Sequence, residues 1–244
     1  MKNCYTYTIL TALLMCFAAC NQTPGIAKKK KAKRQPINYA NYVMEVITYK
    51  TKKGVPAAEY KRLDSVTQQR YTQKQVGYIS KESGIDQQGN WLIVLAWDNV
   101  AHADADKQAF AKSTLWNETL KVIDTTTMSR KRFFVKDDHS SSLKDLKPYV
   151  IELATFKEKK QLKRDTFEKR DQQVEADYIS RQTGYITRRV GMAANGERLM
   201  VIYWKTLADA DAGMKEFLKD QSVADYAKMI DWKTVEMKRF QAVN

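Results

Sequence analysis

The chain has few cysteines and few histidines, and their positions exclude several classes of function. All three cysteines fall within the first 20 of the 244 residues. The remaining sequence therefore offers no disulfide, no thiol nucleophile and no cysteine-based metal site. It also contains no glycine-rich phosphate loop, no Cys/His metal spacing and no GxSxG motif. We expect neither a metal site nor a conventional hydrolase or nucleotide-dependent enzyme.

Residues 1–19 predict a signal peptide that is followed directly by a cysteine. Lys2 precedes an apolar stretch from Ile9 to Ala19, which is too short to span a bilayer as a stable helix. The stretch runs into Phe17-Ala18-Ala19-Cys20, which resembles the lipobox of bacterial lipoproteins. We therefore expect Cys20 to be lipidated and to begin the mature protein. An ordinary secretory signal with an incidental cysteine is the alternative.

Residues 20–40 predict a flexible, basic tether behind this cysteine. Of the formal net charge of +14, Lys2 contributes one charge and the run from Lys28 to Arg34 contributes six, which leaves +7 for residues 41–244. Each cation near an anionic membrane surface contributes roughly 1 kcal/mol. We expect a membrane partner and no nucleic acid. By resemblance to other lipoproteins, the asparagine after Cys20 favours an outer-membrane anchor in the bacterial envelope that faces the periplasm.

The sequence repeats itself at an offset of 107 residues. QVGYIS at Gln75–Ser80 returns as QTGYIT at Gln182–Thr187, and Lys131-Arg132-Phe133 returns as Lys238-Arg239-Phe240. The alignment needs no gap from Tyr42 to Asp137, and about a third of its positions are identical, which is typical of an internal duplication. We expect a first repeat at 41–137, a linker at 138–148 and a second repeat at 149–244.

Hydrophobic periodicity predicts the same elements in both repeats. In the first repeat, strands are expected at 42–50, 75–83, 91–97 and 128–135, and helices near Pro56, near Ala103 and at 115–123. The matching strands of the second repeat include 149–157, 198–204 and 235–243. The order strand, helix, strand, strand, helix, strand is the ferredoxin-like unit of an α+β fold. Its helices cover one face of the sheet, so a second copy is the expected cover for the other.

The Gly-Tyr-Ile after the first helix, the strand that ends in Trp and the acidic, Ala-rich helix start resemble the dimeric α+β barrel superfamily. The most similar group is the antibiotic biosynthesis monooxygenase-like domains. This resemblance implies two ferredoxin-like (βαββαβ) units packed sheet to sheet as a pseudo-dimeric α+β barrel, here fused in one monomeric chain. It also implies a ligand cavity in the barrel lumen. Binding or oxidation of a small hydrophobic or aromatic molecule, without a metal or other cofactor, is one function that follows from it.

Several polar and aromatic residues are candidates for such a site. Glu45 and Glu152 lie in the middle of the first strand of each repeat, where a carboxylate is costly unless it is paired. The expected partners are Lys131 or Arg132 and, in the second repeat, Lys238 or Arg239. Each glutamate is either a general base with a raised pKa or part of a structural ion pair. The aromatic candidates, which line a ligand cavity or pack as core, are Trp97, Trp204, Tyr78 and Tyr185. Arg132 and Arg239 are further candidates for binding the ligand.

The positions of the histidines in the sequence argue against haem as a cofactor. Haem-degrading members of the superfamily use a strand Trp, a His in the following helix and an Asn near the first strand. Trp97 and Trp204 fit the first position, but the expected His and Asn are missing. The two histidines, His102 and His139, fall at a helix start and in the linker. We expect no cofactor.

Two classes of function stay open. One is a cofactor-independent, monooxygenase-like enzyme, which a roomy polar and aromatic lumen would favour. The other is a non-catalytic envelope lipoprotein with a structural, ligand-binding or protein-interaction role, which a lumen filled by side chains would favour. Some equivalent positions differ strongly, so we expect any two cavities to differ: Trp91 and Arg198, Ala96 and Tyr203, Trp116 and Val223, Thr125 and Trp232.

Overall fold

The computed structural model describes residues 42–138, 143, 149–159, 164–217 and 219–243. Cys20, the basic tether and His139 lie outside these residues. All described residues belong to one compact unit. No helix within the described ranges is long and apolar enough to cross a membrane.

The first repeat folds in the expected order. Its elements are β1 (Val43–Thr51), α1 (Ala57–Arg70), a short 3-10 helix η1 (Thr72–Lys74), β2 (Tyr78–Ile85), β3 (Asn90–Trp97), α2 (Val100–Phe110), α3 (Thr114–Val122) and β4 (Ile123–Asp138). Pro56 precedes the first turn of α1 with φ −64°, the value its ring imposes. The side chains of Asn99 and Ser113 accept hydrogen bonds from the backbone N–H groups of His102 and Trp116, which caps α2 and α3.

The second repeat has the same order of elements. These are β5 (Val150–Glu158), α4 (Arg164–Asp177), η3 (Ile179–Arg181), β6 (Tyr185–Met192), β7 (Glu197–Trp204), α5 (Leu207–Phe217), η4 (Gln221–Val223), α6 (Ala224–Met229) and β8 (Ile230–Ala242). Gly77 and Gly184, the glycines of the repeated turn, have φ values of +77° and +75°. A Cβ there would also meet Asp98 and His102 in the first repeat and Asp209 in the second. The turn is repeated because each repeat needs this backbone conformation before its second strand.

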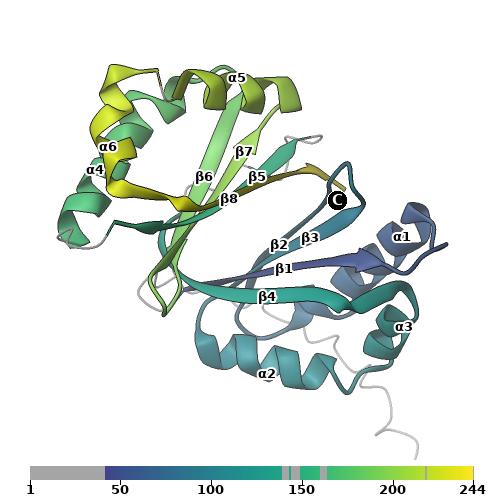
Figure 1. The fold of residues 1–244 in the computed structure, drawn as a ribbon. Helices are drawn as coiled ribbons and strands as arrows, with labels where there is room; N and C mark the ends of the chain where they lie inside the picture. Colours follow the sequence, from purple (N-terminus) through teal and green to yellow (C-terminus); the bar gives the residue numbers. More distant parts are fainter. Residues whose placement is uncertain (1–41, 139–142, 144–148, 160–163, 218, 244) are drawn as a thin grey trace, which may run out of the picture. The chain divides into compact units, whose positions relative to one another are not determined.

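The eight strands close into one antiparallel barrel in the order β1-β3-β2-β8-β5-β7-β6-β4. The repeats join twice, through β2 with β8 and through β4 with β6. Figure 1 shows the helices of each repeat on the outer face of its own strands. The expected fold class, two ferredoxin-like units packed as a pseudo-dimeric α+β barrel, is confirmed.

The final strand of each repeat is longer than expected. β4 begins at Ile123 and β8 at Ile230, five residues before the predicted starts at Met128 and Val235. α2 also begins at Val100 rather than near Ala103, so Asp104 and Asp106 do not lie in its first turn as an acidic start would require.

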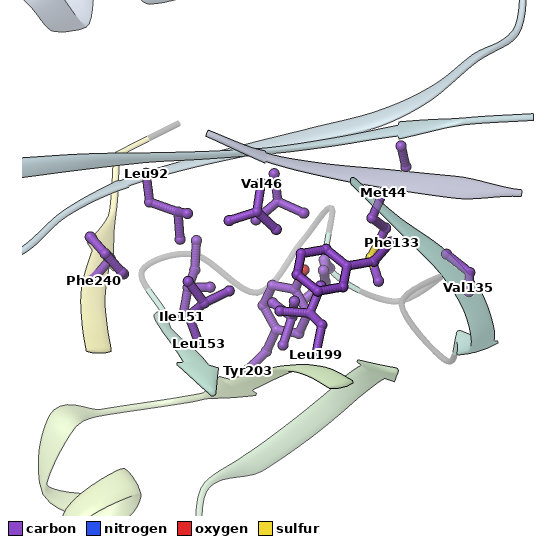
Figure 2. Close-up of a cluster of buried hydrophobic side chains, with 14 of the residues drawn as sticks. Met44, Val46, Leu92, Phe133, Val135, Ile151, Leu153, Leu199, Tyr203 and Phe240 are labelled. Atoms are coloured by element: carbon purple, nitrogen blue, oxygen red, sulfur yellow. The ribbon is translucent and has the colours of Figure 1, made fainter. Parts of the chain in front are cut away.

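Side chains from both repeats fill the barrel lumen. Residues that point inward include Met44, Val46, Leu92, Phe133, Ile151, Leu153, Leu199, Tyr203 and Phe240 (Figure 2). A pocket of about 100 Å³ remains among described residues such as Thr48, Ser129 and Glu236. Small-molecule sites have volumes of roughly 300–1,000 Å³. The expectation of a ligand cavity in the lumen is therefore wrong.

A buried ion pair joins the two repeats inside the barrel. Arg189 of β6 donates from Nη1 to Glu82 Oε2 at 2.7 Å and from Nη2 to Glu82 Oε1 at 3.1 Å. Its Nε also donates to Asp138 Oδ1 at 3.2 Å. Glu82 and Arg189 are separated by the repeat offset of 107 residues, so they occupy equivalent positions that face each other across the pseudo-two-fold axis. Both are buried, with 7% and 1% exposure.

Candidate functional site

A cavity of about 320 Å³ lies between the outer face of the first repeat's sheet and its helices. Ile47 and Tyr49 of β1, with Ile93 and Leu95 of β3, line the sheet side. The helices contribute Leu63 and Thr67 from α1, Asp106 and Phe110 from α2, and Trp116 and Thr119 from α3. This is the side of the sheet that faces the helices, opposite to the filled lumen (Figure 1).

Aromatic rings form much of the cavity wall. The centroids of Tyr71 and Phe110 lie 5.2 Å apart, and those of Phe110 and Trp116 lie 5.7 Å apart. On the opposite side Tyr49 and Tyr60 meet edge to face at 5.6 Å, and their hydroxyl groups are hydrogen-bonded to each other. Burial raises the pKa of Tyr49 well above its ordinary value, and the carboxylate of Asp64 adds to this effect, so its phenol stays neutral.

A buried ion pair also lines this cavity. Lys81 Nζ is 2.5 Å from Asp64 Oδ1, and both side chains are only 3% exposed. The two charges compensate each other, as a buried charge requires. The pair leaves this part of the cavity without net charge.

A second ionic cluster lies where α2 meets β1 and β4. Glu45 accepts hydrogen bonds from Arg130 and from Arg132, whose Nη2 lies 2.8 Å from Glu45 Oε1. Arg132 Nη2 also donates to Asp104 Oδ1 at 2.6 Å. In β-sheet register Glu45 is directly opposite Arg132.

Asp106 of α2 is a further carboxylate beside this cluster. Its side chain is 8% exposed and lines the cavity, and its Oδ1 atom has no hydrogen-bond partner within the described part of the chain. Burial raises the pKa of Asp106 to about 6; Arg130 opposes this shift and Glu45 adds to it. The Tyr71 hydroxyl donates to the Asp106 backbone oxygen at 3.3 Å. A buried carboxyl group with a pKa near the working pH is the type of group that binds a donor or accepts a proton.

The equivalent space in the second repeat is almost closed, at about 80 Å³. Tyr226 of α6 stands where the first repeat has Thr119, and its hydroxyl donates to Asp171 Oδ1 at 2.8 Å. Gly213 replaces Asp106, and the ring of Trp204 uses the space, since a Cβ on Gly213 would lie 2.7 Å from its Cη2 atom. Met237 replaces Arg130. The open, ionic form of the cavity therefore belongs to the first repeat.

The predicted glutamates lie on the helix side of the sheet and not in the lumen. Of the two partners expected for each glutamate, Arg132 pairs with Glu45, and Arg239 pairs with Glu152, with its Nε 2.5 Å from Glu152 Oε2. Burial raises the pKa of Glu152, while Arg239 opposes the shift. Placement in the lumen is wrong because the inward positions of β1 belong to its neighbours, including Met44. A role for either glutamate as a general base stays a prediction.

The four aromatic candidates pack between sheet and helices. Trp97 lies in the core beneath α2, and Tyr78 meets it edge to face at 6.0 Å. Trp204 and Tyr185 repeat this contact at 6.0 Å. Trp204 and Glu152 line the small second cavity, whereas Trp97, Tyr78 and Glu45 are not among the residues that line the first. The prediction of site residues from the sequence did not include Asp106 or Arg130. The signal that could have found them is the alignment of the two repeats, in which Gly213 and Met237 replace them.

The described residues do not fit a haem. The lining of either cavity contains no histidine among the residues placed in the structure. His102 is bound to Asp98, with Nδ1 2.6 Å from its Oδ1, and to Asn99 at the start of α2. Within the described ranges no group of three or more His, Cys, Asp or Glu residues is arranged to hold a metal ion.

Comparison with known proteins places the fold. No family model and no curated protein matches the sequence. Among solved structures, a proposed monooxygenase from Lactobacillus acidophilus superposes with a TM-score of 0.59 at 11% identity, over 84% of this chain and 95% of that one. An anthrone oxidase-like protein gives 0.53 at 11% identity, over 84% and 92%. Chlorite dismutase from Candidatus Nitrospira defluvii, in complex with imidazole, gives 0.57 at 9% identity, over 84% and 92%. The chain shares the dimeric α+β barrel fold of these proteins.

Proposed function

We propose that this protein is a lipid-anchored envelope protein that binds a small aromatic molecule in the helix–sheet cavity of its first repeat. The buried carboxylate of Asp106 carries this proposal, because Asp106 lines an aromatic-walled cavity and its Oδ1 has no hydrogen-bond partner among the described residues. An unsatisfied buried acceptor costs about 1–3 kcal/mol, so a ligand that brings an N–H or O–H donor removes that cost. The closed second cavity shows that the same fold also exists without this space.

Oxidation of the bound molecule is a second candidate function. It is supported by the fold shared with a proposed monooxygenase and an anthrone oxidase-like protein, and by a proton acceptor whose pKa is about 6. In such a reaction Asp106 takes a proton from a CH₂ group of the substrate, and the resulting carbanion gives two electrons to O₂ to form a C–O–OH hydroperoxide. Loss of water from this hydroperoxide breaks its C–H and O–O bonds and leaves C=O. The substrate thereby supplies all four electrons that reduce O₂, so no separate reductant is needed. Consumption of dissolved O₂ by the protein with anthrone as the probe is expected if the bound molecule is oxidised. No consumption is expected if the protein only binds it.

Copying the second repeat's residues into the first is expected to abolish ligand binding while the fold is kept. In the variant Thr119→Tyr with Trp116→Val, the new phenol fills the cavity as Tyr226 does in the second repeat. Native mass spectrometry of the natively purified wild-type chain is expected to show a bound adduct that dissociates when the ions are activated. The variant is expected to show no adduct. Asp225→Asn, an exposed change on α6, is the control and is expected to keep the adduct.

Two outcomes contradict the proposed site. An adduct retained in full by the cavity-filling variant places the ligand elsewhere. A wild-type chain without an adduct, which also fails to take up any of a set of small aromatic compounds, removes the binding function itself. Circular dichroism of the variant confirms that loss of binding does not reflect loss of the fold.

The anchor is tested separately at Cys20. We expect Cys20→Ser to move the protein from the membrane fraction to the soluble fraction, because a lipidated cysteine is what holds the tether to the outer membrane. Cys16→Ser is the matched control, since this cysteine belongs to the predicted signal peptide and is removed with it. Mass spectrometry of the mature N-terminus is expected to show the lipid on Cys20. A Cys20→Ser protein that stays in the membrane fraction contradicts the anchor.

A further inference from the structure

We infer that the ligand of the first-repeat cavity is an organic cation, an amine joined to an aromatic or alkyl body, and that the carboxylate of Asp106 is its counter-ion. This inference rests on the proposed binding function and adds the chemical class of the ligand.

The charges around the cavity leave one carboxylate in excess. Asp64 and Lys81 compensate each other at 2.5 Å. In the cluster beneath α2, the guanidinium groups of Arg130 and Arg132 are already bound to Glu45, and Arg132 also to Asp104. Asp106 is therefore a third carboxylate beside two guanidinium groups. Lys107, which also lines the cavity, is exposed, so water and salt screen its charge.

An anionic ligand fits this arrangement poorly. Lys81 and both arginines already have carboxylate partners, so an incoming anion meets only the Arg130 Nε–H as a cationic donor without a partner among the described residues. It would also lie beside Asp106 as a like charge. A cation instead meets the one buried carboxylate that lacks a positively charged hydrogen-bond partner in the described structure.

The aromatic wall supports the same ligand class. A cation within about 6 Å of a ring centroid is attracted by the negative face of the ring, and tryptophan is the strongest of these partners. Trp116 and Tyr71 line the cavity with Asp106. At the equivalent positions the second repeat has Val223 for Trp116 and Gly213 for Asp106, so its closed cavity lacks both the tryptophan and the carboxylate.

Binding is expected to depend on the protonation of Asp106. The groups that face it are Arg130 on β4, Glu45 on β1 and the Tyr71 hydroxyl after α1, while Lys107 follows it on α2. β3 contributes no titratable side chain. Because the pKa of Asp106 is about 6, an amine binds the ionised carboxylate fully above that pH. Below pH 6 its affinity is expected to fall roughly tenfold for each pH unit, because each ligand must then displace a proton.

The test uses the mature lipoprotein in phosphatidylcholine nanodiscs and three ligands of one shape: 2-phenylethylamine, its neutral isostere 2-phenylethanol and the anion 3-phenylpropionate. Isothermal titration calorimetry at pH 7.5, corrected with empty nanodiscs, is expected to show the amine binding at least tenfold more tightly than the other two. Asp106→Asn is expected to remove that preference, while Asp225→Asn keeps it.

The outcomes distinguish this inference from the binding site itself. Suppose that the alcohol or the carboxylate binds as tightly as the amine, and that the variant Thr119→Tyr with Trp116→Val loses that binding. This result supports the proposed binding site and contradicts the inference that its ligand is a cation. If the amine preference persists in Asp106→Asn, Asp106 is not the counter-ion. If none of the three ligands binds, both the cation and the proposed aromatic site are overturned.

Discussion

Replacing Arg189 by glutamate is expected to lower the free energy of unfolding by about 3–5 kcal/mol, the usual cost of leaving a buried charge without its partner. Arg189 is 1% exposed and bridges Glu82 and Asp138 inside the barrel. The substitution puts three carboxylates together where water cannot solvate them. Urea unfolding at constant pH measures the loss. Glu82→Arg is expected to cost a similar amount, since it places two guanidinium groups in contact.

The exchange of both charges is expected to recover much of this loss. Glu82 and Arg189 are equivalent positions of the two repeats, so Glu82→Arg with Arg189→Glu restores an ion pair in nearly the same geometry. Recovery is incomplete because Asp138 then lies beside a glutamate. As a control, exchange of the exposed pair Asp225 and Lys228 is expected to change stability much less, because water screens exposed ion pairs. A double variant no more stable than either single one contradicts a direct interaction.

This ion pair also shows what the duplication permits. In a symmetric homodimer a residue beside the two-fold axis meets its own copy, so a charged residue there meets a like charge. Two copies of the first repeat would bring Glu82 against Glu82, and two copies of the second would bring Arg189 against Arg189. Because the repeats are fused and have diverged, equivalent positions carry opposite charges. The charges of Glu82 and Arg189 therefore favour pairing of a first repeat with a second repeat over pairing of two identical repeats.

The repeat and the strand periodicities predict two ferredoxin-like units, and the resemblance to the dimeric α+β barrel superfamily predicts their packing as a barrel. Once two ferredoxin-like units are identified, the neighbours of each strand within a unit follow, and they limit the expected partner of Glu45 to Lys131 or Arg132. The sheet face could not be predicted in the same way. Alternation along β1 shows that Glu45 shares a face with Val43, but the neighbouring positions are also buried, since helices cover one side and the other repeat covers the other. Both faces are apolar, so the pattern does not tell them apart.

The differences in element boundaries have local causes. At its start β4 is a polar, exposed run between Thr125 and Ser129, where neither face is buried. Without burial, no alternation of apolar residues marks a strand. The register with β1 also shifts between Thr48 and Lys50, so pairing resumes beyond this irregularity, where Lys50 pairs with Asp124.

The cavity could not be predicted because it depends on volume and not on a motif. The sequence shows that Trp116 differs from Val223, but not that Tyr226 fills the space that Thr119 leaves open. Asp106 looked like one residue of an acidic helix start. Its importance follows from three facts that require coordinates: it faces the sheet, its oxygen lacks a partner among the described residues, and the neighbouring cations are already paired.

Asp106→Asn is expected to stabilise the unliganded protein by about 2–3 kcal/mol at pH 7.5 and by little at pH 4, since one pKa unit corresponds to about 1.4 kcal/mol. Burial raises the pKa of this carboxyl group from 3.8 to about 6. Between these values the folded protein keeps a proton that the unfolded chain releases, so stability falls as the pH rises through this window. Above pH 6 the folded state carries the full cost of the buried charge, which asparagine avoids.

Urea unfolding of both proteins at pH 4, 5, 6 and 7.5 measures this difference, and the two stability curves are expected to diverge as the pH rises. Asp225→Asn, which removes an exposed carboxylate whose pKa is lowered by Lys228, is expected to shift stability in the opposite direction. Curves that run parallel from pH 4 to 7.5 would show that the Asp106 pKa is not raised. Natural proteins keep residues that lower stability where activity depends on them. A measured cost of Asp106 at neutral pH would therefore support its proposed role in ligand binding.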